Sequence, residues 1–152
     1  VTGIQNGVGH VADNMNEYVD IVSFNNYLGW YGGTLDDLKT TNWEIPYNKP
    51  FFISEFGGGA LQGLHGDKDT RWSEEYQDEL YKNTLEMYER QDGWIGTSPW
   101  ILMDFRSARR QLAGIQDFYN RKGLISNRGI KKKAFFTLQS FYKKKAEEYK
   151  NK

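Results

Sequence analysis

The feature that most constrains the fold is a short apolar run that ends in an acid and a cluster of glycines. From Lys49 to Gly59 the sequence reads Lys-Pro-Phe-Phe-Ile-Ser-Glu-Phe-Gly-Gly-Gly. The residues from Phe51 to Ile53 predict a strand that is apolar on both faces, which is typical of parallel sheets covered by helices. Functional side chains gather at the carboxyl ends of such strands. Glu55 follows this strand directly, so it is either a functional carboxylate or a solvated acid at a strand end.

Composition excludes several classes of function. The chain has 152 residues, which fits one domain, and Lys+Arg and Asp+Glu number 20 each. Without a net charge there is no field that would attract a nucleic acid, so we expect no nucleic-acid partner. There is no cysteine, and the two histidines, His10 and His65, are too far apart in sequence to indicate a metal site. No apolar run approaches the roughly 18 residues of a spanning helix, so we expect no membrane partner.

The aromatic share of 16% is high and indicates flat apolar platforms, which suit sugar rings, bases or protein partners. The chain begins at Val1 rather than Met and no signal peptide precedes it. We therefore expect it to be a segment of a longer protein, and its cellular location stays open.

Hydrophobic periodicity predicts an alternation of strands and helices along the chain. We expect strands over 1–5, 19–24, 51–53 and 95–105, and helices over 7–18, 34–43, 73–90 and a final stretch that contains 135–149. Thr34 and Ser73 are expected to cap their helices, and the lysine runs near the last helix are expected to form a solvated face.

This alternation predicts a parallel α/β fold, with long loops after each clear strand on the same side of the sheet. The sequence contains neither a Gly-x-Gly-x-x-Gly nor a Walker-type loop, which disfavours a nucleotide-binding sheet. Loops of this kind are typical of one face of a (β/α)8 barrel, which needs about 250 residues. We therefore expect residues 1–152 to form a single partial barrel domain, about strands five to eight.

Several motifs occur in an order that resembles a known enzyme family. They are Asn25–Tyr31, Ser54–Gly57, Gly63–His65, Trp72–Gln77, Trp100 with Asp104-Phe105, and Asn120–Gly123. Together they resemble the carboxyl-terminal half of the catalytic barrel of family 2 glycoside hydrolases, the β-glucuronidases and β-galactosidases. The resemblance extends from about Val19 to Tyr142.

The resemblance implies a retaining β-glycosidase that uses no cofactor, with a β-glycoside as its substrate. Glu55 matches the family nucleophile at the end of barrel strand seven. Tyr27 and Tyr31 match aromatic residues beyond strand six, the first of them close to the nucleophile. Trp100 matches the tryptophan that forms the floor of the sugar site, since an indole face packs against the C–H side of a pyranose.

The substrate implied by the resemblance is a β-glucuronide. Asn120 and Lys122 match the Asn-x-Lys pair by which β-glucuronidases hold the sugar carboxylate, and such a pair supplies charge-assisted donors. The arginine that usually precedes this pair in the family is replaced here by the stretch Gln116–Tyr119. A β-galactosidase of the same family therefore remains the alternative.

A retaining glycosidase needs two carboxylates, and the second is not matched here. The family acid/base follows an asparagine after strand four, whereas the Asn-Glu pair of this chain, Asn16-Glu17, precedes strand six. We reject Glu17 for that role and expect the chain alone to be inactive. The missing half of the barrel or a homo-oligomeric partner would then complete the site.

Other residues and other classes of function also need consideration. Asp104 supports a strand end in the family, and we expect His65 to make a local structural bond. A non-catalytic carbohydrate-binding module would use Trp30, Trp100 and Tyr27 as platforms. A purely structural half-barrel is the remaining alternative.

Overall fold

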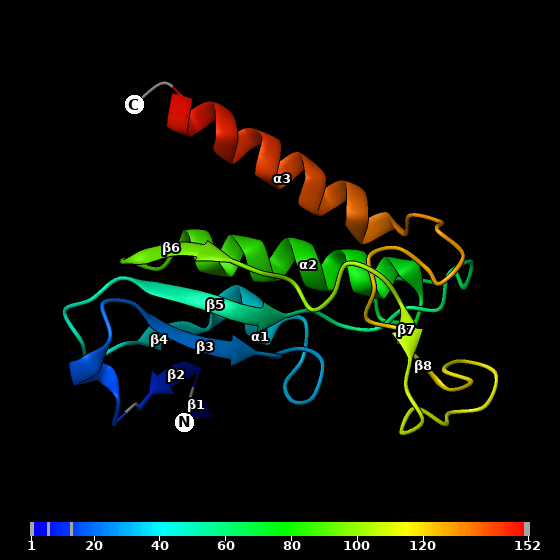
Figure 1. The fold of residues 1–152 in the computed structure, drawn as a ribbon, viewed down its shortest axis with the longest axis horizontal. Helices are drawn as coiled ribbons and strands as arrows, with labels where there is room; N and C mark the ends of the chain where they lie inside the picture. The colour runs from blue at the N-terminus through cyan, green and yellow to red at the C-terminus, as the bar shows by residue number, and fades with distance from the viewer. Residues whose placement is uncertain (1, 6, 13, 151–152) are drawn as a thin grey trace. The chain divides into compact units, whose positions relative to one another are not determined.

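The computed structural model describes residues 2–5, 7–12 and 14–150 (Figure 1). Its strands are β1 (Thr2–Gln5), β2 (Val8–Val11), β3 (Val22–Asn26), β4 (Asn42–Glu44), β5 (Phe51–Phe56), β6 (Trp94–Thr97), β7 (Phe105–Arg106) and β8 (Tyr119–Asn120). Its helices are η1 (Asn16–Tyr18, a 3-10 turn), α1 (Asp37–Thr40), α2 (Glu74–Glu89) and α3 (Lys133–Lys150). The chain forms two compact units: unit 1 comprises Val1–Gly57 and Asn83–Trp100, and unit 2 comprises Gly58–Lys82 and Ile101–Lys152.

The central sheet of unit 1 is parallel, with β5 between β3 and β6 (Figure 1). Phe51 and Ile53 on β5 and Val22 on β3 are at most 1% exposed. Both the strand at Phe51 and the parallel α/β arrangement are therefore confirmed. The register pairs Val22 with Phe51 at one end and Asn25 with Glu55 at the other, so Glu55 lies toward the carboxyl end of the sheet.

The helix expected over 7–18 is wrong. Residues Val8–Val11 form β2, which pairs antiparallel with β1 and parallel with β4. Among the other residues of this range that the structure describes, which exclude residue 13, helical structure is limited to a single 3-10 turn over Asn16–Tyr18. Gly7 adopts a positive φ of 75°, which suits the turn between β1 and β2. A Cβ on Gly9 would lie 2.3 Å from the Trp43 ring, so this glycine lets β4 come close.

The helix expected over 34–43 is confined to Asp37–Thr40, because the chain enters β4 at Asn42. Thr34 does accept a hydrogen bond from the Asp37 amide, at 3.2 Å, and the Asp37 carboxylate accepts one from the Thr34 amide at 2.7 Å. This reciprocal pair stabilises the start of the helix, although helix α1 itself begins later than expected.

The strand expected over 95–105 is also too long. Strand β6 ends at Thr97, two residues before Pro99, which has no amide hydrogen for a sheet ladder. The following segment belongs largely to unit 2, where Ile101 N–H donates to the Lys122 carbonyl at 3.2 Å and Leu124 N–H donates to the Ile101 carbonyl at 3.0 Å.

Unit 2 is built from loops, the short antiparallel pair of β7 and β8, the first half of α2, and α3. Ser73 caps α2 as expected, because its hydroxyl accepts a hydrogen bond from Tyr76 N–H at 3.0 Å. Helix α3 buries Ala134 and Leu138 and exposes most of its lysines. None of the helices in the described ranges is long and apolar enough to cross a membrane.

Candidate active site

The candidate nucleophile Glu55 and the candidate site tyrosine Tyr27 are joined by a hydrogen bond. Tyr27 follows the last residue of β3, and Glu55 lies near the end of the neighbouring strand β5. The Tyr27 hydroxyl donates to Glu55 Oε2 at 2.7 Å, and both residues are half-buried. A short bond of this type holds one carboxylate oxygen in place and stabilises its negative charge.

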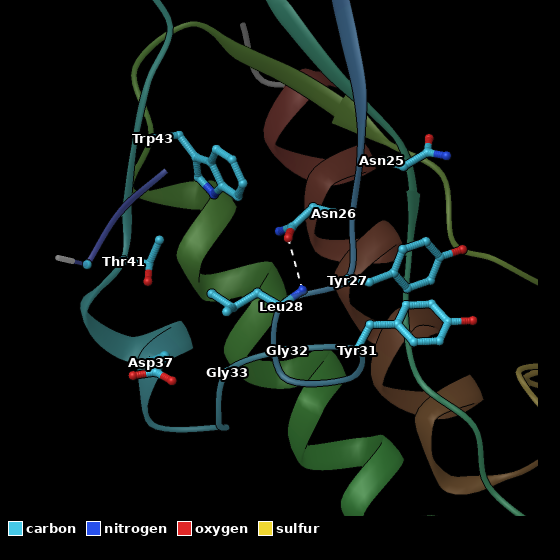
Figure 2. Close-up of a pocket in the computed structure, with 11 residues that line it drawn as sticks. Asn25, Asn26, Tyr27, Leu28, Tyr31, Gly32, Gly33, Asp37, Thr41 and Trp43 are labelled. Atoms are coloured by element: carbon cyan, nitrogen blue, oxygen red, sulfur yellow. Dashed lines mark hydrogen bonds between the residues drawn. The ribbon is translucent and has the colours of Figure 1, made fainter. Parts of the chain in front are cut away.

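Tyr31 lies against Tyr27 in the turn that follows β3. Gly29, with φ of 80°, allows the turn, and the amides of Trp30 and Tyr31 donate to the Tyr27 carbonyl at 3.0 and 3.1 Å. The rings of Tyr27 and Tyr31 meet edge to face, with centroids 5.2 Å apart (Figure 2). Tyr31 remains 62% exposed, so its ring is available to a ligand.

A second pair beside Glu55 was not singled out by sequence reasoning. The register of β3 and β5 shifts between Phe24 and Asn25, which leaves Ser54 unpaired between Ile53 and Glu55. The Ser54 hydroxyl donates to Asn25 Oδ1 at 2.7 Å. Irregular pairing of this kind is common next to active sites, where it re-aims a side chain. The sequence signal that would have indicated this pair is Asn25, an amide near the end of the strand that neighbours the strand of Glu55.

A pocket of about 670 Å³ lies beside these residues in unit 1 (Figure 2). Its lining is polar and aromatic: Gly7, Asn25, Asn26, Tyr27, Leu28, Tyr31, Gly32, Gly33, Asp37, Thr41 and Trp43. Asn26 is held by bonds to the Tyr88 hydroxyl and the Leu28 amide. Within the described ranges the Thr41 hydroxyl and the Trp43 indole nitrogen have no hydrogen-bond partner. Glu55 does not line this pocket, but Tyr27 lines it and also donates a hydrogen bond to Glu55.

The remaining aromatic candidates of unit 1 differ in exposure. Trp100 is half-buried, and its amide donates to the Phe56 carbonyl at 2.8 Å, which fixes its backbone next to the residue after Glu55. Trp30 is only 4% exposed. A buried indole cannot serve as a sugar platform, so this part of the binding-module alternative is wrong.

Asn120 and Lys122 lie together in unit 2. Asn120 ends β8, and its Oδ1 accepts a hydrogen bond from the Lys122 amide at 3.1 Å. The two residues are 5% and 4% exposed. This hydrogen bond, from a backbone amide to a side chain two residues earlier, defines a tight local turn. The turn fixes the backbone positions of Asn120 and Lys122 relative to each other.

Asp104 and His65 have structural partners in unit 2. Asp104 contacts Lys132 at 2.9 Å, and burial raises the pKa of its carboxyl group while the charge of Lys132 opposes that shift. His65 Nδ1 lies 2.9 Å from Glu75 Oε1, as expected for a local structural bond. The described part of the chain contains no cluster of three His, Asp or Glu residues suited to a metal ion.

If Glu55 has the role that the family resemblance implies, we expect Tyr27→Phe to weaken hydrolysis by the gene product that carries this chain, without unfolding it. The change removes one hydroxyl and its bond to Glu55 but keeps the ring that packs on Tyr31. A hydrogen bond to a charged group is worth about 1.5–3 kcal/mol, so kcat/KM should fall about ten- to a hundredfold. Steady-state kinetics on an aryl β-glucuronide measure the loss, and Tyr31→Phe, which keeps the Glu55 contact, is the matched control. Equal effects of the two changes would contradict this role.

Comparison with known proteins identifies the relatives of this chain. No model of a known protein family matches it. The β-glucuronidase of Rattus norvegicus is 35% identical over 147 residues, which cover 90% of this chain and 22% of that protein. The structure of a β-glucuronidase from an uncultured Clostridium species has a TM-score of 0.72 at 27% identity and covers 89% of this chain. The GH2 β-galacturonidase from Eisenbergiella tayi, bound to galacturonate, has a TM-score of 0.70 at 27% identity and covers 87%.

These matches extend over nearly all of this chain but over a small part of each relative. The chain covers 22% of the rat protein and 25% of each of the two solved structures. The resemblance predicted from the motifs is confirmed by both sequence and structure. The chain resembles, over nearly its whole length, about a quarter of a family 2 glycoside hydrolase.

Proposed function

We propose that this chain carries the nucleophile of a retaining β-glycosidase and that the substrate is a β-glucuronide. The hydrogen bond between Tyr27 and Glu55, at the carboxyl end of a central parallel strand, is the observation that carries the proposal. It gives the chain an oriented carboxylate where parallel α/β enzymes keep their chemistry. The names of the related proteins support the same reaction class.

In the proposed reaction one Glu55 oxygen attacks the anomeric carbon as the bond to the leaving-group oxygen breaks. A second carboxylic acid protonates that oxygen, and the sugar becomes a covalent ester of Glu55. The same second group then removes a proton from water, which attacks the anomeric carbon and releases Glu55. The two carboxyl groups must lie about 5–5.5 Å apart. We propose that the second one comes from the missing half of the barrel or from another copy.

The proposed architecture is a single partial catalytic domain over residues 1–152. In it, β3, β5 and β6 act as strands six, seven and eight of a (β/α)8 barrel. Their parallel order and the crossover through α2 support this assignment. The solved structures of GH2 enzymes at TM-scores of 0.70 and above support it too.

The proposed uronate specificity rests on Asn120 and Lys122. Both are buried and lie in one turn, and the bond from the Lys122 amide to Asn120 Oδ1 holds the backbone of this pair with little freedom. A carboxylate is the group that such a pair recognises best. One similar structure is named a β-galacturonidase, which makes a β-galacturonide the second candidate substrate. A neutral β-galactoside is the comparison that separates uronate recognition from sugar binding in general.

A mechanism-based 2-fluoro glycoside tests the proposed reaction in the gene product that carries this chain. The fluorine slows breakdown of the covalent intermediate, so we expect a mass increase of one fluorosugar on the peptide that contains Glu55. The Glu55→Gln variant should remain unlabelled. Label on another carboxylate would contradict the assignment, and sugar binding without any label would favour a carbohydrate-binding module.

We expect Lys122→Ala to impair a β-glucuronide far more than the matching β-galactoside. A lost charged contact to a carboxylate is worth about 1.5–3 kcal/mol, or about ten- to over a hundredfold in kcat/KM. The neutral substrate has no carboxylate and should lose little. The ratio of kcat/KM for the two substrates is the measurement, and an unchanged ratio would show that Lys122 does not read a uronate.

A further inference from the structure

A buried ion cluster in unit 2 holds together three loop segments, and the proposed reaction does not use it. Its centre is Lys132, whose side chain is fully buried just before α3. The Lys132 ammonium donates to the Ala60 carbonyl at 2.7 Å, to Asp104 Oδ1 at 2.9 Å and to the Arg121 carbonyl at 3.1 Å. A lysine has three N–H donors, so each of them has an acceptor.

The same cluster fixes the backbone on both sides of Lys122. Arg121, the residue before it, gives its carbonyl to Lys132, and Gly123, the residue after it, donates its amide to Asp104 Oδ1 at 2.9 Å. A Cβ on Gly123 would lie 2.2 Å from the Asp104 amide nitrogen, so only glycine permits this approach. Lys122 therefore lies between two residues that are both tied to the Lys132–Asp104 pair.

The side chain of Arg121 adds further restraints to this segment. Its Nη1 donates to Asn127 Oδ1 at 2.7 Å and lies 3.5 Å from Asp104 Oδ2, and its Nε donates to the Ile115 carbonyl at 3.1 Å. The guanidinium also lies 4.7 Å from the centre of the Tyr119 ring. The middle residue of the Asn-x-Lys pattern thus points into the cluster and holds the turn.

Such a cluster stabilises a loop at a large cost in desolvation free energy, because its charges are removed from water. Burial lowers the pKa of the Lys132 ammonium, and the Asp104 carboxylate only partly offsets this effect. Well-packed apolar residues of similar volume often stabilise a protein as well as a buried ion pair does. The ion pair also fixes the geometry of the segment, because each hydrogen bond joins a defined donor to a defined acceptor. A fixed backbone geometry matters most for a segment whose side chains bind a ligand.

We propose that Lys132 is a positioning residue that fixes Asn120 and Lys122 for binding of the substrate carboxylate. This inference rests on the proposed function, because it assumes that these two residues hold a uronate. Lys132 does not itself contact the sugar. It acts through the Arg121 carbonyl and through Asp104, which holds Gly123.

The test uses the double variant Lys132→Met/Asp104→Asn in the gene product that carries this chain. Removing Lys132 alone would leave the buried Asp104 carboxylate with only the longer Arg121 contact, at 3.5 Å, as a counter-charge. The double change removes the charges of both Lys132 and Asp104 and nearly keeps their side-chain volumes. Leu138→Ala, which opens a cavity on α3, is the control for lost stability. Titration of active sites with the fluorosugar corrects every rate for unfolded protein.

We expect the double variant to lose about ten- to a hundredfold in kcat/KM on an aryl β-glucuronide, mainly through a higher KM. The loss on the β-galactoside should be several times smaller, and Leu138→Ala should change neither corrected rate. When Lys122→Ala is already present, the double change should add little on the glucuronide, because the group that it positions is gone.

Two results would overturn the inference. One is an equal loss on both substrates, and the other is a full, additive loss when Lys122→Ala is present. Gly123→Ala, which pushes the segment away from Asp104 without altering a charge, should reproduce the shift in substrate ratio, and its failure to do so also counts against the inference. If the wild-type protein hydrolyses glucuronides but the ratio is unchanged, only the role of Lys132 fails. If it hydrolyses no glycoside and Glu55 takes no label, the proposed function fails with it.

Discussion

Glu55→Gln is expected to abolish glycoside hydrolysis by the gene product that carries this chain. Glutamine is nearly the same size as glutamate and can still accept a hydrogen bond from the Tyr27 hydroxyl, so the fold should persist. The amide carries no charge to attack the anomeric carbon, and the covalent route is therefore lost. Loss of a nucleophile in enzymes that work through a covalent intermediate costs about 10⁴-fold or more in kcat.

The measurement is kcat on an aryl β-glucuronide, together with a thermal melt of the same sample. Glu17→Gln is the matched control, because Glu17 is an exposed glutamate in the 3-10 turn η1 of the same unit. Its activity should be unchanged. If Glu55→Gln kept more than a small fraction of the wild-type rate, Glu55 would not be the nucleophile.

The parts of the fold that could be predicted are those whose signal is local. Three consecutive apolar residues after a proline predict β5, and a serine followed by two glutamates predicts the start of α2. Both elements begin within one residue of the expected position. The parallel order then follows from the alternation of elements, because a crossover helix joins β5 to β6.

The parts that could not be predicted depend on contacts between distant residues. Val8–Val11 is a strand because β4 pairs with it, and that pairing requires Trp43 to pack over Gly9. The local pattern of residues 7–18 does not indicate that β4 is the partner of this segment. The strand prediction for the segment after Pro99 is wrong for the same reason, since Ile101 pairs with Lys122 and Leu124 rather than extending β6.

The site shows the same division. The family motifs propose Glu55, Tyr27, Asn120 and Lys122 as site residues, but they do not identify the groups that hold these residues in place. The run Lys131-Lys132-Lys133 was expected to be a solvated face, and the outer two lysines are indeed exposed. The prediction is wrong for Lys132, which is buried among three oxygen acceptors. Charge alone cannot reveal this, because the acceptors come from positions 60, 104 and 121.

The proposed reaction needs a second carboxylate near Glu55, and the Asn-Glu pair of this chain does not supply it. Asn16-Glu17 is the pair in this chain that matches the family Asn-Glu pattern. The Asn16 carbonyl accepts a hydrogen bond from Lys49, which lies just before β5, whereas Glu55 lies near the other end of that strand. Strands rise about 3.3 Å per residue, so five or six residues of β5 separate the two sites by far more than the 5–5.5 Å that a retaining enzyme needs.

We therefore expect the 152-residue chain by itself to show no useful glycosidase activity. General acid help to the leaving oxygen is worth about 10²–10⁴-fold, and no motif of this chain supplies it. The described edges of the central sheet are β3 and β6. Open edges favour association, so the chain should dimerise, aggregate or need its missing half.

To test this last expectation, the chain is purified alone and assayed on an aryl β-glucuronide and an aryl β-galactoside. Sedimentation of the same sample measures its oligomeric state. Adding the proposed missing half of the barrel in trans is the matched control, because under the proposal it would restore the second carboxylate and cover the edges at β3 and β6 without altering any residue of this chain. Activity that appears only in the mixture would place the acid/base outside residues 1–152. A monodisperse monomer with robust turnover would show the opposite. A complete pair of carboxylates would then lie within these residues, and the partial-barrel assignment would be wrong.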